Sequence, residues 1–207
     1  MKNLFKLLVI VLLLGYGSQS FAQTFAAKAG LNLTNMLSKD DDETYSKDFK
    51  TKVGFHIGGT AEFEITEMFS FETGLFLSTQ GYKVNTSFGD FTTNLLYVNI
   101  PLTGKARYEL DDFNIYGLFG PCVGLGLSGK VKSGGNSSNI DWGSGEDNDL
   151  KRFDFGWIIG AGIEYGPFVG GLQYQLGLAN IAASNEDGFR VKNRVFQITF
   201  GYRFGLD

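Results

Sequence analysis

The chain has 207 residues, of which 15% are aromatic, 29 are glycine and 3 are proline, and its formal net charge at pH 7 is −4. This composition excludes a collagen-like or disordered chain, and the excess of acidic residues argues against a nucleic-acid partner, which requires a basic face. Cys122 is the single cysteine, so an intramolecular disulfide framework is excluded as well.

Residues 1–22 have the three parts of a secretory signal peptide. Two lysines precede a short apolar core (LLVIVLLL), and the segment ends in the small residues of Ser20-Phe21-Ala22. A transmembrane helix would need about 20 apolar residues, so we expect cleavage and export instead. The mature domain then covers residues 23–207, and no later segment has the length of an apolar spanning helix.

Apolar and polar residues alternate along many segments of the mature chain, and this period of two predicts β-strands. We predict eight strands, approximately at residues 24–36, 51–65, 68–82, 92–108, 113–130, 151–165, 167–181 and 191–205. Each exceeds the roughly 9–11 residues with which a tilted strand crosses a bilayer. Strands and helices do not alternate, which disfavours α/β folds.

The predicted connectors alternate in length. The short ones are Thr66-Glu67, 109–112 and Gly166, and the long polar ones are 37–50, 83–91, 131–150 and 182–190. Short turns on one side and long loops on the other are typical of outer-membrane barrels. We therefore predict an all-β, eight-stranded antiparallel up-and-down transmembrane β-barrel with both termini on the periplasmic side.

The volume of the side chains predicts which face of each strand points outward. In the last strand, FQITFGYRF, bulky apolar residues alternate with small, polar or charged ones, and other strands repeat this pattern. An eight-stranded interior is only just wide enough to be filled by side chains, so we place the bulky series outside and the glycine-rich series inside. The alternative is a lipocalin-like secreted binder, which would hold its bulky residues and a small ligand inside.

Charged residues of both signs fall on the glycine-rich series near the predicted periplasmic ends. They are Lys28, Glu62, Glu64, Glu72, Lys105, Arg107, Glu164 and Arg203. An unpaired buried charge costs several kcal/mol, so we expect these side chains to neutralise one another inside the lumen. The pattern favours a salt-bridge plug that keeps the barrel closed; the alternative is a narrow pore, lined by the same residues, for ions or small solutes.

No motif for catalysis or metal binding emerges. His56, the only histidine, is predicted to face the lumen, with Ser78 and Glu72 on the neighbouring strand, but this spacing matches no catalytic arrangement. The acidic residues of the long loops are of the type that binds calcium, yet the pattern of a calcium-binding loop is absent. We predict no enzymatic activity, no cofactor and no metal site. Loop 131–150 is expected to be flexible and solvated, with Trp142 as a contact point for a partner.

Three segments resemble the PorT-like outer-membrane β-barrel family of Bacteroidota. They are 27–36 (AKAGLNLTNM), 97–108 (YVNIPLTGKARY) and the closing FGYRF. The resemblance implies an OmpA-like eight-stranded barrel without a cofactor in the outer membrane of a Gram-negative bacterium. We expect a monomer with a structural or surface-interaction role, surrounded by outer-membrane lipid and lipopolysaccharide. Any extracellular partner would meet loops 37–50 and 131–150.

Overall fold

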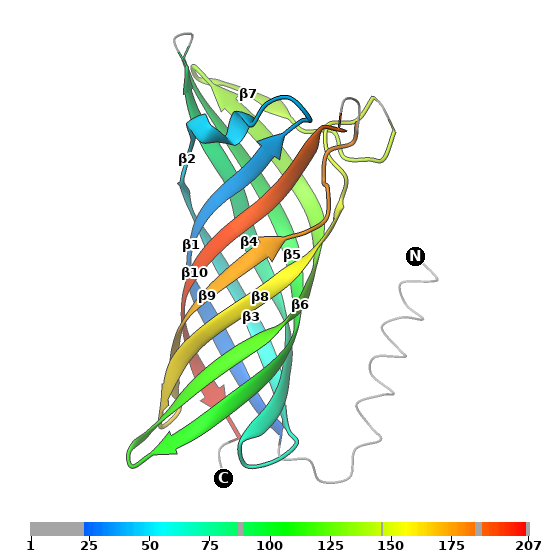
Figure 1. Cartoon of the computed structure of the whole chain (residues 1–207). Coiled ribbons are helices and arrows are strands. Elements are labelled where there is room, and N and C mark those ends of the chain that lie inside the picture. Colours follow the sequence, from blue (N-terminus) through cyan, green and yellow to red (C-terminus); the bar gives the residue numbers. More distant parts are fainter. Residues whose placement is uncertain (1–22, 87–88, 146, 185–187, 206–207) are drawn as a thin grey trace, which may run out of the picture.

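The computed structural model describes residues 23–205 except 87–88, 146 and 185–187, so the predicted signal peptide lies outside the described residues. Its long strands form an antiparallel ring (Figure 1). These strands are β1 (Gln23–Lys39), β3 (Lys52–Glu64), β4 (Phe69–Thr86), β5 (Gly89–Leu110), β6 (Phe113–Ser133), β8 (Phe153–Tyr165), β9 (Phe168–Gly177) and β10 (Arg190–Phe204). Short elements are the 3-10 helix η1 (Tyr45–Asp48), β2 (Phe49–Lys50) and β7 (Asn136–Asn139).

The ring closes because β1 pairs with β3 on one side and with β10 on the other. The register of β1 and β10 runs from Phe25 opposite Phe204 to Lys39 opposite Arg190. Every other long strand pairs with the long strands before and after it in the chain. This arrangement confirms the predicted eight-stranded up-and-down barrel. Within the described part of the chain, no helix is long and apolar enough to cross a membrane.

The bulky side chains point outward, as predicted. On β10, Phe196, Phe200 and Tyr202 are exposed, whereas Gln197 and Arg203 between and beside them are buried. The same alternation follows β1 and β6. A wall of exposed aromatic and aliphatic side chains is unfavourable in water and suits contact with lipid. The outward orientation contradicts the lipocalin-like alternative.

One predicted connector and the end of one predicted strand are wrong. Residues 83–91 are not a long loop, because β4 and β5 stay paired up to Thr86 opposite Gly89. Their polar side chains do not end the strands, since the neighbouring strands satisfy the backbone hydrogen bonds whatever the side chains are. The strand predicted at 167–181 ends at Gly177 instead. The residues after it turn toward the barrel mouth, where Ile181 is fully buried.

Candidate functional site

The two ends of the barrel differ, and we name them by their connections. The turn end carries the short turns and both ends of the described chain, and the loop end carries η1, β2, β7 and the long connectors (Figure 1). The lumen between these ends is the candidate site, because the inward faces of the strands hold most of the buried polar and charged residues.

Charged side chains fill the turn end of the lumen. The structure brings all the sequence-predicted lumen charges into ion pairs there, and we call them the ion-pair cluster: Lys28, Glu62, Glu64, Glu72, Lys105, Arg107, Glu164 and Arg203. The strands that supply them are β1, β3, β4, β5, β8 and β10, so the cluster connects distant parts of the ring. Four cations face four anions, which leaves the cluster formally neutral.

Glu164 is the centre of the ion-pair cluster. Its carboxylate accepts hydrogen bonds from Nζ of Lys105, from Nε of Arg107 at 2.9 Å and from Nη1 of Arg203 at 2.7 Å. The Glu164 residue is 1% exposed. Removing its charge would leave Arg203 without a carboxylate partner, and Lys105 and Arg107 with their other carboxylates only.

Glu62 is the second acceptor of the cluster. It binds Lys105 at 2.8 Å and Arg107 at 2.5 Å, and the Ser70 hydroxyl donates to it at 2.7 Å. Farther into the barrel, Lys28 binds Glu72 at 2.6 Å. These hydrogen bonds satisfy the buried charges while occupying the cross-section of the lumen.

The middle of the lumen contains a polar network around His56. Nδ1 of His56 lies 2.7 Å from Oδ1 of Asn32, and Nε2 lies 3.0 Å from the hydroxyl of Thr199. Ser78, which sequence reasoning considered as a partner, instead accepts a hydrogen bond from Asn32 at 2.9 Å. A cavity of about 30 Å³ lies beside this network. His56 on β3 therefore links its strand to β1 and β10, and the hydroxyl that it contacts belongs to Thr199 rather than to Ser78.

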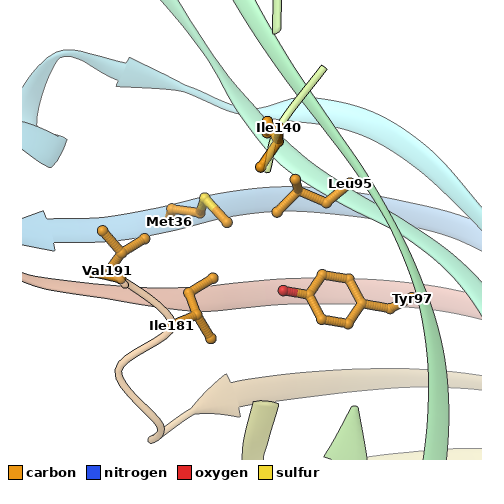
Figure 2. Close-up of a cluster of buried hydrophobic side chains, with 7 residues drawn as sticks. Met36, Leu95, Tyr97, Ile140, Ile181 and Val191 are labelled. Carbon is orange, nitrogen blue, oxygen red and sulfur yellow. The ribbon is translucent and has the colours of Figure 1, made fainter. Parts of the chain in front are cut away.

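Apolar side chains close the loop end. We call them the apolar cap: Met36, Leu95, Tyr97, Ile140, Ile181, Ala182 and Val191. Three come from connectors and the others from β1, β5 and β10. Figure 2 shows the labelled members of the cap pointing toward one another. The connectors are also held together by their backbones, because the amide of Lys151 donates to the carbonyl of Ile181 at 2.7 Å.

The prediction that loop 131–150 is flexible and solvated is wrong for its apolar residues. Ile140 is buried in the apolar cap, and Trp142 and Leu150 pack against it. The indole of Trp142 lies over Gly126 of β6, and the guanidinium of Arg152 lies 5.9 Å from the indole centroid. Trp142 thus faces the barrel mouth, where it is not a free contact point.

Gly126→Ala is expected to displace Trp142, because a methyl group at this position would overlap the indole ring. Overpacking of this kind costs about 1–3 kcal/mol. In a Trp157→Phe background, Trp142 is the remaining tryptophan, and its fluorescence should shift to the red as the ring enters water. Gly117→Ala on the same strand is the control, because a methyl group there meets no atom closer than 3.9 Å. An unchanged spectrum in Gly126→Ala would contradict this packing.

In the connector after β1, hydrogen bonds from nearby residues fix the carboxylate of Asp40. The hydroxyl of Tyr45 donates to Asp40, and the amides of Glu43 and Asp42 donate to the same carboxylate at 2.6 Å and 2.8 Å. These hydrogen bonds, that of Tyr45 above all, hold the pKa of Asp40 below its ordinary value. In the described residues, no three His, Cys, Asp or Glu side chains form a group that could hold a metal ion.

The residues of the ion-pair cluster were predictable from the sequence, but the apolar cap was not predicted. Its available signal was Ile140, an isolated apolar residue inside the polar connector 131–150, whereas Ile181 was placed at the end of a predicted strand. Exposed apolar residues in a loop are ordinary when they occur singly, so this signal acquires meaning only when two connectors meet at the barrel mouth.

Known outer-membrane proteins match most of this chain. A family model described as the outer membrane protein beta-barrel domain matches residues 19–183. The chain is similar to the attachment invasion locus protein Ail of Yersinia pestis, with 17% identity and a TM-score of 0.45 over 89% of this chain and 100% of that chain. It is also similar to OprG from Pseudomonas aeruginosa, with 13% identity and a TM-score of 0.49 over 89% and 97% of the two chains. No curated protein matches.

Proposed function

Because the chain belongs to the family of the outer membrane protein beta-barrel domain, whose model matches residues 19–183, we propose that it is a closed outer-membrane barrel. Its role is structural or lies in contacts made at the membrane surface, and it performs no catalysis. The barrel holds its connectors at the extracellular loop end, and the turn end faces the periplasm.

One observation supports this proposal above the others: the lumen is filled at both ends by different chemistry. The ion-pair cluster occupies the turn end, with Lys105, Glu62 and Glu164 each at most 3% exposed. The apolar cap occupies the loop end, with Ile181 and Tyr97 fully buried. To pass, an ion would have to displace the ion-paired side chains at the turn end and the apolar side chains at the loop end.

Wild-type protein reconstituted into a planar bilayer is therefore expected to show no steady unitary current. The measurement is single-channel recording on the purified chain, whose mass also shows whether it begins at Gln23 after signal-peptide cleavage. Heat-modifiable migration on a detergent gel verifies that the recorded protein is folded. Reproducible wild-type currents would contradict the closed lumen.

The alternative function is a narrow pore for ions or small solutes, lined by the ion-pair cluster. It is supported by the mixed charges and by the small cavity near His56. If currents appear, Glu72→Gln and Arg107→Gln should change their conductance or selectivity, whereas Glu67→Gln in the exposed turn should not. This combination of results would contradict the proposed closed barrel and support a pore function.

We further propose that the chain is a PorT-like member of the barrel family. The segments 27–36 and 97–108, which carry the resemblance, lie in β1 and β5, and FGYRF lies in β10. Export through the 1–22 signal peptide, the outer membrane of a Gram-negative bacterium as the site, and a monomeric state accompany this proposal. Lipid and lipopolysaccharide then surround the wall.

An extracellular partner would meet loops 37–50 and 131–150, as expected from the sequence. Tyr45 in η1 is 42% exposed and its ring lies 6.4 Å from that of Phe189 in a neighbouring connector. The four residues of β7 are all exposed. Because Trp142 turns inward, the accessible part of 131–150 is centred on β7.

A further inference from the structure

Three basic residues follow one another along the outward face of β10. Arg190, Lys192 and Arg194 occupy alternate positions, and Phe196 comes next on the same face. At the rise of a β-strand, alternate residues are about 6.7 Å apart, so these cations extend over about 13 Å. The outer face of β10 thus changes from basic to apolar between Arg194 and Phe196.

Lys39 of β1 belongs to the same basic surface, because it lies directly opposite Arg190 in the strand register. We call Lys39, Arg190, Lys192 and Arg194 the basic strip. Like charges opposite one another destabilise a sheet, so this pair carries a cost in the isolated barrel. All ion pairs among the described residues lie in the ion-pair cluster, and none involves the basic strip. An external anion would relieve this repulsion.

The position of the basic strip identifies the kind of anion. Below Arg194, β10 continues outward with Phe196 and Phe200, which belong to the lipid-facing wall. A ligand that touches both parts must have an anionic group above apolar chains. A soluble polyanion supplies the charge but has no chains to lie along Phe196.

We propose that the basic strip binds the phosphorylated headgroup of an outer-leaflet lipid, with the acyl chains of that lipid against Phe196 and Phe200. The guanidinium and ammonium groups reach the phosphates from the barrel wall, as basic side chains do at membrane interfaces. This site rests on the membrane placement proposed above but does not depend on whether the lumen is closed.

The test uses the folded mature protein in detergent with a chelator present, so that divalent cations cannot bridge phosphates to acidic loops. Native mass spectrometry compares the binding of diphosphorylated lipid A with that of its dephosphorylated form. The basic-strip variant is Arg190→Gln/Lys192→Gln/Arg194→Gln. The matched control is Lys47→Gln/Lys83→Gln/Lys132→Gln, which removes the same charge from exposed lysines elsewhere near the loop end.

Each cation near an anionic lipid surface changes affinity roughly fivefold, so the triple basic-strip variant should bind diphosphorylated lipid A more weakly than wild type by about tenfold or more. The control variant should bind like wild type, and wild type should prefer the phosphorylated lipid. Equal binding by wild type and the basic-strip variant would overturn the proposal.

A second outcome would also overturn it. If the basic-strip variant loses binding of a soluble sulfated oligosaccharide but keeps lipid A, the surface serves a polysaccharide. Heat-modifiable migration verifies that each variant is folded. Channel currents from wild type would refute the closed lumen but would not contradict lipid binding by the basic strip, because the two proposals concern different faces of the wall.

Discussion

Glu164→Gln is expected to lower the free energy of unfolding of the barrel by about 3–5 kcal/mol, the loss typical of breaking a buried ion pair from one side. The neutral amide keeps the size of the side chain but leaves four cations against three anions in the ion-pair cluster. Arg203 loses its carboxylate partner and retains the Gly166 carbonyl at 2.8 Å. Denaturant unfolding in lipid vesicles, followed by tryptophan fluorescence, measures the change.

Two further variants separate this electrostatic cause from a packing defect. Glu67→Gln, in the exposed turn before β4, should change the unfolding free energy by less than about 0.5 kcal/mol. Adding Arg203→Gln to Glu164→Gln removes one charge of each sign, so the double variant should recover about 1 kcal/mol or more relative to Glu164→Gln. A Glu164→Gln barrel as stable as wild type would show that the ion-pair cluster does not need its central carboxylate.

Ile181→Ala is expected to open the apolar cap. Ile181 is fully buried in the apolar cap, in the same cluster as Met36 and Tyr97 (Figure 2), and truncating a buried isoleucine to alanine costs about 2–5 kcal/mol. Because Ile181 itself lies on a connector, the loss falls on local opening of the connectors while the strands stay paired. The connector before β8 is hydrogen-bonded to Ile181 through the amide of Lys151, so it should open with the cap. Trypsin should then cleave it at Lys151 or Arg152 at least roughly thirtyfold faster, since cleavage follows the population of the open form.

Leu178→Ala is the control for the cap, because Leu178 lies on the same connector as Ile181, between β9 and β10, but is 40% exposed. Its cleavage rate should match wild type, and both variants should keep heat-modifiable migration. Unchanged cleavage of Ile181→Ala would mean that the cap does not hold the connectors. With the ion-pair cluster intact, Ile181→Ala should still show no unitary current, which distinguishes the two ends of the lumen.

The fold was predictable because a barrel repeats one local rule. The period of two in FQITFGYRF assigns Phe196 and Phe200 to one face and Arg203 to the other, and the structure has them so. Strand ends were less predictable. Polar residues at 83–91 indicated a loop, yet β4 and β5 continue, because backbone pairing with neighbouring strands is a property of the sheet.

The strand number and the two faces of each strand were readable from the sequence, because a period of two is a local pattern. The volume of the side chains then assigned one face, with its charges, to the lumen. Which of these charges meet depends on the closure of the ring. Glu164 on β8 joins Lys105 and Arg203 because closure brings β5, β8 and β10 around one narrow lumen. The apolar cap depends on the same closure: Ile140 and Ile181 lie on separate connectors, and only the curvature of the ring brings them together over Tyr97.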